Sequence, residues 1–153
     1  MRPTVKAVCI GALVGGALDL AFAIGFAASN GLAPSTLLQA IASGWFGSAS
    51  FNMGAVSVAI GLVSHFALSL GWAALFVALA TWFRLTSRAW LSGPLFGAFV
   101  FLGMRLVVLP LSAFPKPMNF DMPGALYDLL SHMFLFGLPI ALAARSFLSG
   151  RRA

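Results

Sequence analysis

Asp128 and His132 are the residues whose types and spacing most directly suggest chemistry in this sequence. They lie four residues apart, so a helix places both side chains on one face. The surrounding stretch, 125–145, is otherwise largely apolar and is typical of a membrane-spanning helix. An ionisable group inside a span is costly and usually marks a pathway, a binding site or a packing device. This face is therefore the first candidate site.

Three further ionisable residues, Asp19, His65 and Arg105, lie inside other apolar stretches. Measured from the basic ends of the spans, Asp19 and His132 lie at a depth of about 20 Å, Arg105 and Asp128 at about 25 Å, and His65 at about 28 Å. All five thus share one layer in the outer half of the bilayer. Because a lone charge facing lipid is unfavourable, we expect them to face one another, with Arg105 paired to Asp19, Asp128 or both.

Two roles for this cluster follow from the residue types. As a structural device, Arg105 and the two aspartates neutralise one another and fix the helix register, with the histidines as hydrogen-bonded companions. As a relay, the cluster handles protons or ions, because histidine titrates near neutrality and a neighbouring carboxylate shifts that titration. Four spans are few for a transporter, so for this role we expect a homo-oligomer.

Metal and haem binding are weaker alternatives. Asp128 and His132 offer an oxygen and a nitrogen ligand, which Asp19 and His65 could complete, but Arg105 at the same depth would repel a cation. A haem held by both histidines is disfavoured, since their depths differ by roughly 9 Å. No cofactor is predicted.

Enzymatic motifs are missing from the sequence. It contains no Gly-x-Ser-x-Gly elbow, no His-Glu-x-x-His and no phosphate-binding glycine loop. Ser131 adjoins His132, but neighbours in a helix do not face each other. Enzymatic activity is therefore unsupported.

Composition indicates that lipid is the solvent of this chain. Hydrophobic residues make up 61% and charged residues 8%, against about 45–50% and about 25% in soluble domains. The formal net charge of +6 comes mostly from basic residues at the ends of apolar stretches, which indicates topology and not nucleic-acid binding. These residues are Arg2, Lys6, Arg84, Arg88, Arg145, Arg151 and Arg152.

The predicted fold is an all-α membrane protein with four transmembrane helices in an up-down bundle and a short interfacial or re-entrant helix between the first two. We expect a single transmembrane domain, 1–153, with spans at about 7–29, 54–83, 89–113 and 125–148 and the short outer-side helix at about 34–46. The basic residues place both termini in the cytoplasm and leave Lys116 outside.

Other features of the first span concern packing. Gly11 and Gly15, with Gly16 beside them, offer a flat strip that we expect to pack against another helix of the same chain. Asp19 in this apolar run favours a retained helix over a signal peptide. Cys9 is the only cysteine, which excludes an internal disulfide.

Several segments resemble a known group of proteins. They are GALVGGALD at Gly11 to Asp19, QAIASG at Gln39 to Gly44, the pair His65 and Phe66, VVLPLSA ending at Ala113, and HMFLFGLPIA at His132 to Ala141. Together they resemble small bacterial inner-membrane proteins, uncharacterised in activity and distantly similar to the YagU type. The resemblance implies four spans in that membrane, with His65, Asp128, His132 and the position of Arg105 among the polar positions of the group. Arg105 itself departs from the Asn or His of other members, and no activity carries over.

Two functions remain open from the sequence. In the first, the protein uses its polar cluster for proton or small-solute passage. In the second, it is an accessory or assembly subunit of a larger membrane complex, and the cluster is structural. The expected partners are the lipid bilayer and either further copies of the chain or such a complex; no nucleic-acid partner is expected.

Overall fold

The computed structural model describes residues 1–115 and 122–149, and its regular structure is helical. Four helices are long and apolar enough to cross a membrane, and a shorter helix, α2 (Pro34–Phe46), lies between the first two. The four spans are Pro3–Ser29, Ala55–Phe83, Leu85–Leu111 and Gly124–Leu148. The predicted fold class is confirmed, and these are the helices of a multi-pass membrane protein. Lys116, Arg151 and Arg152, used in the topology prediction, lie outside the described residues.

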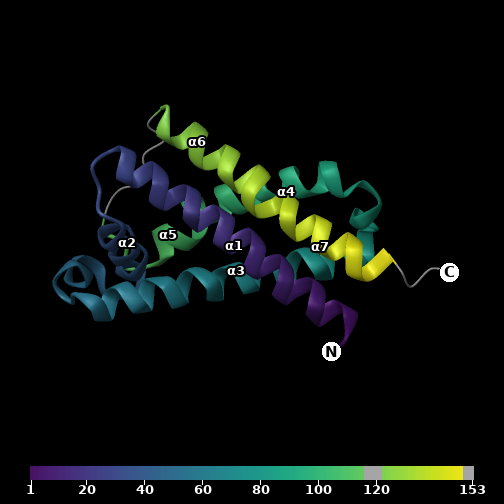
Figure 1. Ribbon diagram of the computed structural model, residues 1–153, viewed down its shortest axis with the longest axis horizontal. Coiled ribbons are helices and arrows are strands. Elements are labelled where there is room, and N and C mark those ends of the chain that lie inside the picture. Colours follow the sequence, from purple (N-terminus) through teal and green to yellow (C-terminus); the bar gives the residue numbers. More distant parts are fainter. Residues whose placement is uncertain (116–121, 150–153) are drawn as a thin grey trace.

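The spans run side by side and bring the start of α1 and the end of α7 to one end of the bundle (Figure 1). We call this the terminal end and the opposite one the distal end. The first span is α1 (Pro3–Ser29), and the second, α3 (Ala55–Phe83), follows α2 and a 3₁₀ turn, Gly47–Asn52. Pro3 and Pro34 begin their helices, where a missing backbone N–H leaves no bond unmade.

The third and fourth spans each contain a π-helical segment, which the sequence analysis did not predict. The third consists of a 3₁₀ turn (Leu85–Arg88), α4 (Ala89–Gly103), a π segment (Met104–Val108) and α5 (Leu109–Leu111). The fourth consists of α6 (Gly124–Ser131), a π segment (His132–Gly137) and α7 (Leu138–Leu148). Each π segment ends two residues before a proline, Pro110 or Pro139. Proline has no N–H to donate, and its ring crowds the preceding turn. The wider π turn makes room for the ring and for the missing hydrogen bond.

The apolar core fills the half of the bundle next to the termini. Phe76 of α3, Val100 of α4 and Ile140 of α7 are fully or almost fully buried there. A Cβ on Gly11 would meet the Ile140 Cα at 3.3 Å, and one on Gly15 would meet the Phe136 carbonyl oxygen at 2.9 Å. The prediction that these glycines pack against another helix of the chain is therefore confirmed.

A second glycine contact joins the third and fourth spans. A Cβ on Gly97 would overlap the carbonyl oxygen of His132, and one on Gly137 would overlap the carbonyl oxygen of Gly93. Only glycine permits such an approach of two backbones. The contact fixes α4 against the π segment of the fourth span, so Arg105 of the third span faces Asp128 of the fourth.

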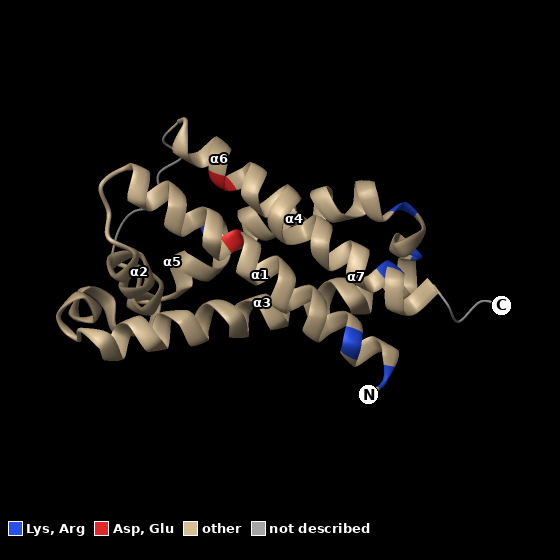
Figure 2. Cartoon of the chain, in the orientation of Figure 1, with Lys and Arg blue, Asp and Glu red and all other residues tan. Residues whose placement is uncertain are grey.

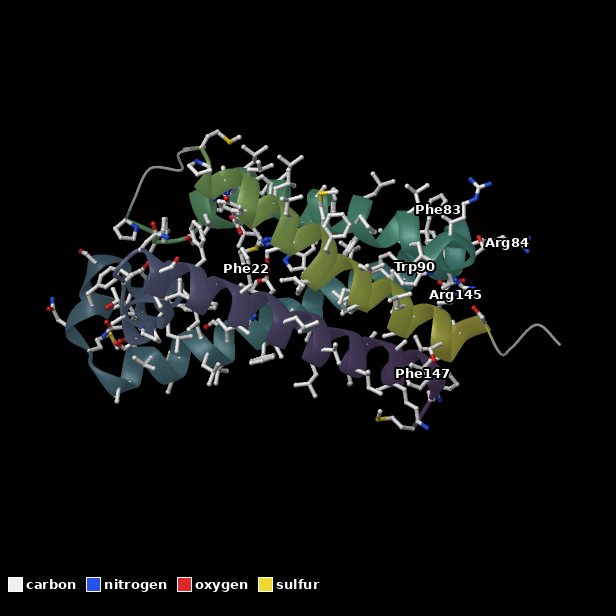
Figure 3. All side chains as sticks on the ribbon, turned by 45° about the horizontal axis from the view of Figure 1, so that its top comes forward. Phe22, Phe83, Arg84, Trp90, Arg145 and Phe147 are labelled. Carbon is white, nitrogen blue, oxygen red and sulfur yellow. The ribbon has the colours of Figure 1, made fainter. Side chains whose placement is uncertain are left out.

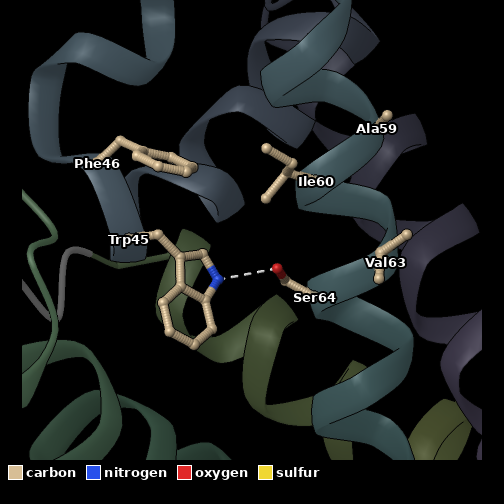
Figure 4. A pocket seen from close by; sticks show the side chains of 6 residues that line it. All are labelled: Trp45, Phe46, Ala59, Ile60, Val63 and Ser64. Atoms are coloured by element: carbon tan, nitrogen blue, oxygen red, sulfur yellow. Dashed lines mark hydrogen bonds between the residues drawn. The ribbon is translucent and has the colours of Figure 1, made fainter.

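The short helix α2 packs against the distal half of α3. A Cβ on Gly61 of α3 would overlap the Leu38 carbonyl oxygen of α2. The other side of α2 is bound to the chain just after the end of the third span, where the Ala113 N–H donates to the Gly44 carbonyl oxygen at 2.9 Å. Between α2 and α3 lies an apolar pocket, where the Trp45 indole donates to the Ser64 hydroxyl at 2.9 Å (Figure 4). The other residues that line the pocket have apolar side chains, and this bond pairs its two polar side chains with each other. The pocket therefore presents an apolar surface and no reactive group.

Candidate functional site: an intramembrane polar cluster

An ion pair between the third and fourth spans forms the centre of the site. The Arg105 Nη2 lies 2.8 Å from Asp128 Oδ2, and Nε donates to the same oxygen at 3.3 Å. The guanidinium also lies 4.9 Å from the centroid of the Phe101 ring. The Arg105 side chain is 16% exposed and that of Asp128 39%. The arginine is thus held inside the bundle, and its carboxylate partner reaches an open surface.

His132 lies between two carboxylates. Its Nδ1 is 3.1 Å from Asp128 Oδ1 and 3.7 Å from Asp19 Oδ1. The same nitrogen is 2.9 Å from the Asp128 backbone carbonyl oxygen, one helical turn earlier. The two oxygens of Asp128 therefore have different partners, since Oδ2 faces Arg105 and Oδ1 faces the imidazole. Of the two aspartates offered as partners for Arg105, Asp128 is the one that pairs with it.

Asp19 is tied to the fourth span by a serine that the sequence analysis did not select. The Ser131 hydroxyl donates to Asp19 Oδ1 at 2.7 Å, and both residues are buried. Ser131 and His132 are neighbours in the fourth span, and their side chains do not face each other. Both nevertheless contact Asp19, because α1 packs between the two directions in which these side chains point. A buried carboxylate requires hydrogen-bond donors. A serine at the same depth as Asp19 was therefore the signal from which this contact could have been predicted.

His65 joins the cluster through a cavity and has no direct bond to its other members. Its Nε2 is 2.8 Å from the Gly16 carbonyl oxygen on α1. A cavity of about 60 Å³ is lined by His65, Asp19, His132 and Ser69 among others. The structure therefore brings all five predicted residues to one region in the distal half, as the depth argument requires.

A cleft of about 370 Å³ gives access to the cluster and is lined by Asp19, Arg105, Asp128, Ser131 and Phe22 among others. On the terminal side of the cleft, α1 and the fourth span are in close contact through Gly11 and Gly15. The rings of Phe26 and Tyr127, whose centroids are 5.6 Å apart, bridge the two helices toward the distal end. Asp19 lines both the cleft and the smaller cavity, so the Asp19–His132 pair separates them.

Charge is distributed unevenly along the bundle (Figure 2). Lysines and arginines gather at the terminal end, while Asp19 and Asp128 lie in the distal half beside Arg105. Within residues 1–115 and 122–149, no group of three or more His, Cys, Asp or Glu side chains is placed to hold a metal ion. At the weaker metal alternative, Asp128 and His132, a cation would also lie against the Arg105 guanidinium.

Four apolar spans around a buried arginine, aspartate and histidine cluster define a small multi-pass helical membrane protein. No protein-family model, curated protein or solved structure matches the chain. The polar cluster is therefore the feature of the chain that bears on its function.

Proposed function

We propose that the protein resides in a bacterial inner membrane with both termini in the cytoplasm, and that its cluster passes protons or a small polar solute. The basic residues at the terminal end support the orientation, because loops rich in lysine and arginine stay cytoplasmic. The resemblance to small inner-membrane proteins of the YagU type supports the choice of membrane. In this orientation the cleft lies in the half of the bilayer away from the cytoplasm.

The observation that carries the proposal is the series of acid–base groups beside the cleft. Asp128 and Asp19 both line the cleft, and His132 Nδ1 lies between them, 3.1 Å from Asp128 Oδ1 and 3.7 Å from Asp19 Oδ1. Imidazoles titrate near neutral pH, and series of carboxylates and imidazoles inside helix bundles act as proton relays. A purely structural pair would need no open cleft beside it.

Beyond Asp19, the path reaches the small cavity with His65 and Ser69 and then meets the apolar core around Phe76 and Ile140. Passage to the terminal end therefore requires the core to open. The two π segments support such a movement, because they interrupt the regular hydrogen-bond ladder in the spans that carry Arg105 and His132. The cluster then acts as a site loaded from the distal side and emptied after a conformational change.

The test is proton flux into liposomes that contain the purified protein and a pH-sensitive dye. We expect flux above that of empty liposomes, reduced at least tenfold by Asp128→Asn and by Asp19→Asn. Ser64→Ala is the matched control, because it removes a polar group of the apolar pocket outside the cluster and is expected to keep the flux. Size-exclusion chromatography of each variant confirms that it is folded.

Flux equal to that of empty liposomes in the unaltered protein would refute proton passage. An ion- or solute-loaded liposome series then tests the remaining part of the proposal. If these also show no flux, and the protein copurifies with a larger complex in fixed stoichiometry, the accessory-subunit hypothesis replaces it.

A further inference from the structure

A pocket at the terminal end lies outside the cluster and is built by the turn between α3 and α4. Arg84 ends α3 in the left-handed conformation, with φ at 55°. Its carbonyl oxygen accepts bonds from the Ser87 N–H at 3.2 Å and from the Ser87 hydroxyl at 2.9 Å. The Ser92 hydroxyl donates to the Leu85 carbonyl oxygen at 2.9 Å. These bonds tie the turn to itself and to the first turns of α4.

The pocket combines positive charge with apolar surface. Its volume is about 540 Å³, and Arg84, Arg88, Leu91 and Leu95 are among the residues that line it. Both arginines are exposed, and among the described residues neither pairs with a carboxylate. The described acidic residues are in the distal half, so two uncompensated guanidinium groups face one pocket. Guanidinium groups match the oxygens of a phosphate by paired hydrogen bonds.

Aromatic side chains place this pocket at the level of lipid headgroups. Trp82 and Trp90 are 82% and 66% exposed, and tryptophan collects at membrane–water interfaces. Figure 3 shows Phe83, Arg84, Trp90 and Arg145 together at the terminal end. Leu91 and Leu95, four residues apart, extend the pocket along α4 toward the bilayer interior.

We propose that this pocket binds one anionic phospholipid, whose phosphate lies between Arg84 and Arg88 and one of whose acyl chains lies along Leu91 and Leu95. A soluble phosphate compound would use the arginines but leave the apolar part of the pocket unfilled. A zwitterionic lipid would fill the apolar part, but its cationic group would oppose the two arginines. The combination therefore selects a lipid with a net negative headgroup.

The test uses the full chain in detergent micelles with equal amounts of phosphatidylglycerol and phosphatidylcholine, and native mass spectrometry counts the lipids retained. We expect one phosphatidylglycerol per chain in preference to phosphatidylcholine. Each arginine near the headgroups contributes roughly a fivefold change in affinity, so Arg84→Gln with Arg88→Gln should weaken phosphatidylglycerol binding about twenty-five-fold. Arg2→Gln with Lys6→Gln removes the same charge at the same end and should leave binding within twofold.

Two further arms separate the alternatives. The single variant Arg88→Gln keeps one basic residue in the turn, and its affinity for phosphatidylglycerol should fall roughly fivefold. This variant replaces the double variant if the double variant does not fold. Glycerol 3-phosphate in millimolar excess should leave the lipid bound. Displacement by glycerol 3-phosphate would assign the pocket to a soluble phosphate compound, and an equal loss in the Arg2 and Lys6 control would show nonspecific attraction. Either result overturns the proposal.

Discussion

The ion pair between Arg105 and Asp128 can be tested by a double-mutant cycle. Removing one partner of a fully buried pair costs about 3–5 kcal/mol. The Asp128 side chain is 39% exposed and lines the cleft, and it keeps His132 at 3.1 Å when the arginine is removed. We therefore expect Arg105→Leu to lower the free energy of unfolding by about 2–3 kcal/mol, below that range. The double variant with Asp128→Asn carries no unpaired carboxylate, and we expect it to recover about 1–2 kcal/mol as coupling energy.

The assay is thermal unfolding in detergent, followed by the loss of the monodisperse peak in size-exclusion chromatography. A cost of about 2–3 kcal/mol corresponds to a decrease in Tm of roughly 5–10 °C for a chain of this size. Arg145→Leu is the matched control at an exposed arginine, and its effect should stay within about 0.5 kcal/mol. Additive effects of Arg105→Leu and Asp128→Asn, with no coupling, would refute the pairing as an energetic contact.

Two further predictions concern packing and Asp19. Gly97→Ala should lower the free energy of unfolding by about 1–3 kcal/mol, because the added Cβ overlaps the His132 carbonyl oxygen. Gly71 has open space around it, so Gly71→Ala should be neutral or stabilising. The Tm of each variant measures the effect, and equal effects would contradict the close contact. Ser131→Ala should cost about 1.5–3 kcal/mol because Asp19 loses a buried donor, while Ser29→Ala, at an exposed bond, should change Tm little.

The arrangement of the spans was predictable because the bilayer imposes it on the sequence. Four apolar stretches of sufficient length must be helices in lipid, and the basic residues mark their ends. Once the ends are known, the helical rise fixes the depth of each polar residue, which is why Arg105 and Asp128 were expected at the same level. Their distance of 2.8 Å follows from that equality and from the cost of leaving either charge in lipid.

The partners within the cluster were less predictable, because depth gives no rotation about the helix axis. The rotation of the third span is set by Gly93 and Gly97, which the sequence analysis did not single out although they repeat the spacing of Gly11 and Gly15. The rotation of the fourth span changes within its π segment, between His132 and Gly137. A fixed angle per residue fails across such a segment, so the contact of Ser131 with Asp19 could not be derived from spacing alone.

The prolines connect these two observations. Pro110 and Pro139 each follow a π segment by two residues, and Arg105 and His132 lie inside those segments. In a regular helix, proline removes one backbone bond, and the ring displaces the preceding turn. The π segment absorbs this displacement by including one more residue per turn, which rotates everything before it relative to everything after it. The apolar faces of α4 and α7 can therefore pack at the terminal end while Arg105 and Asp128 turn toward each other at the distal end.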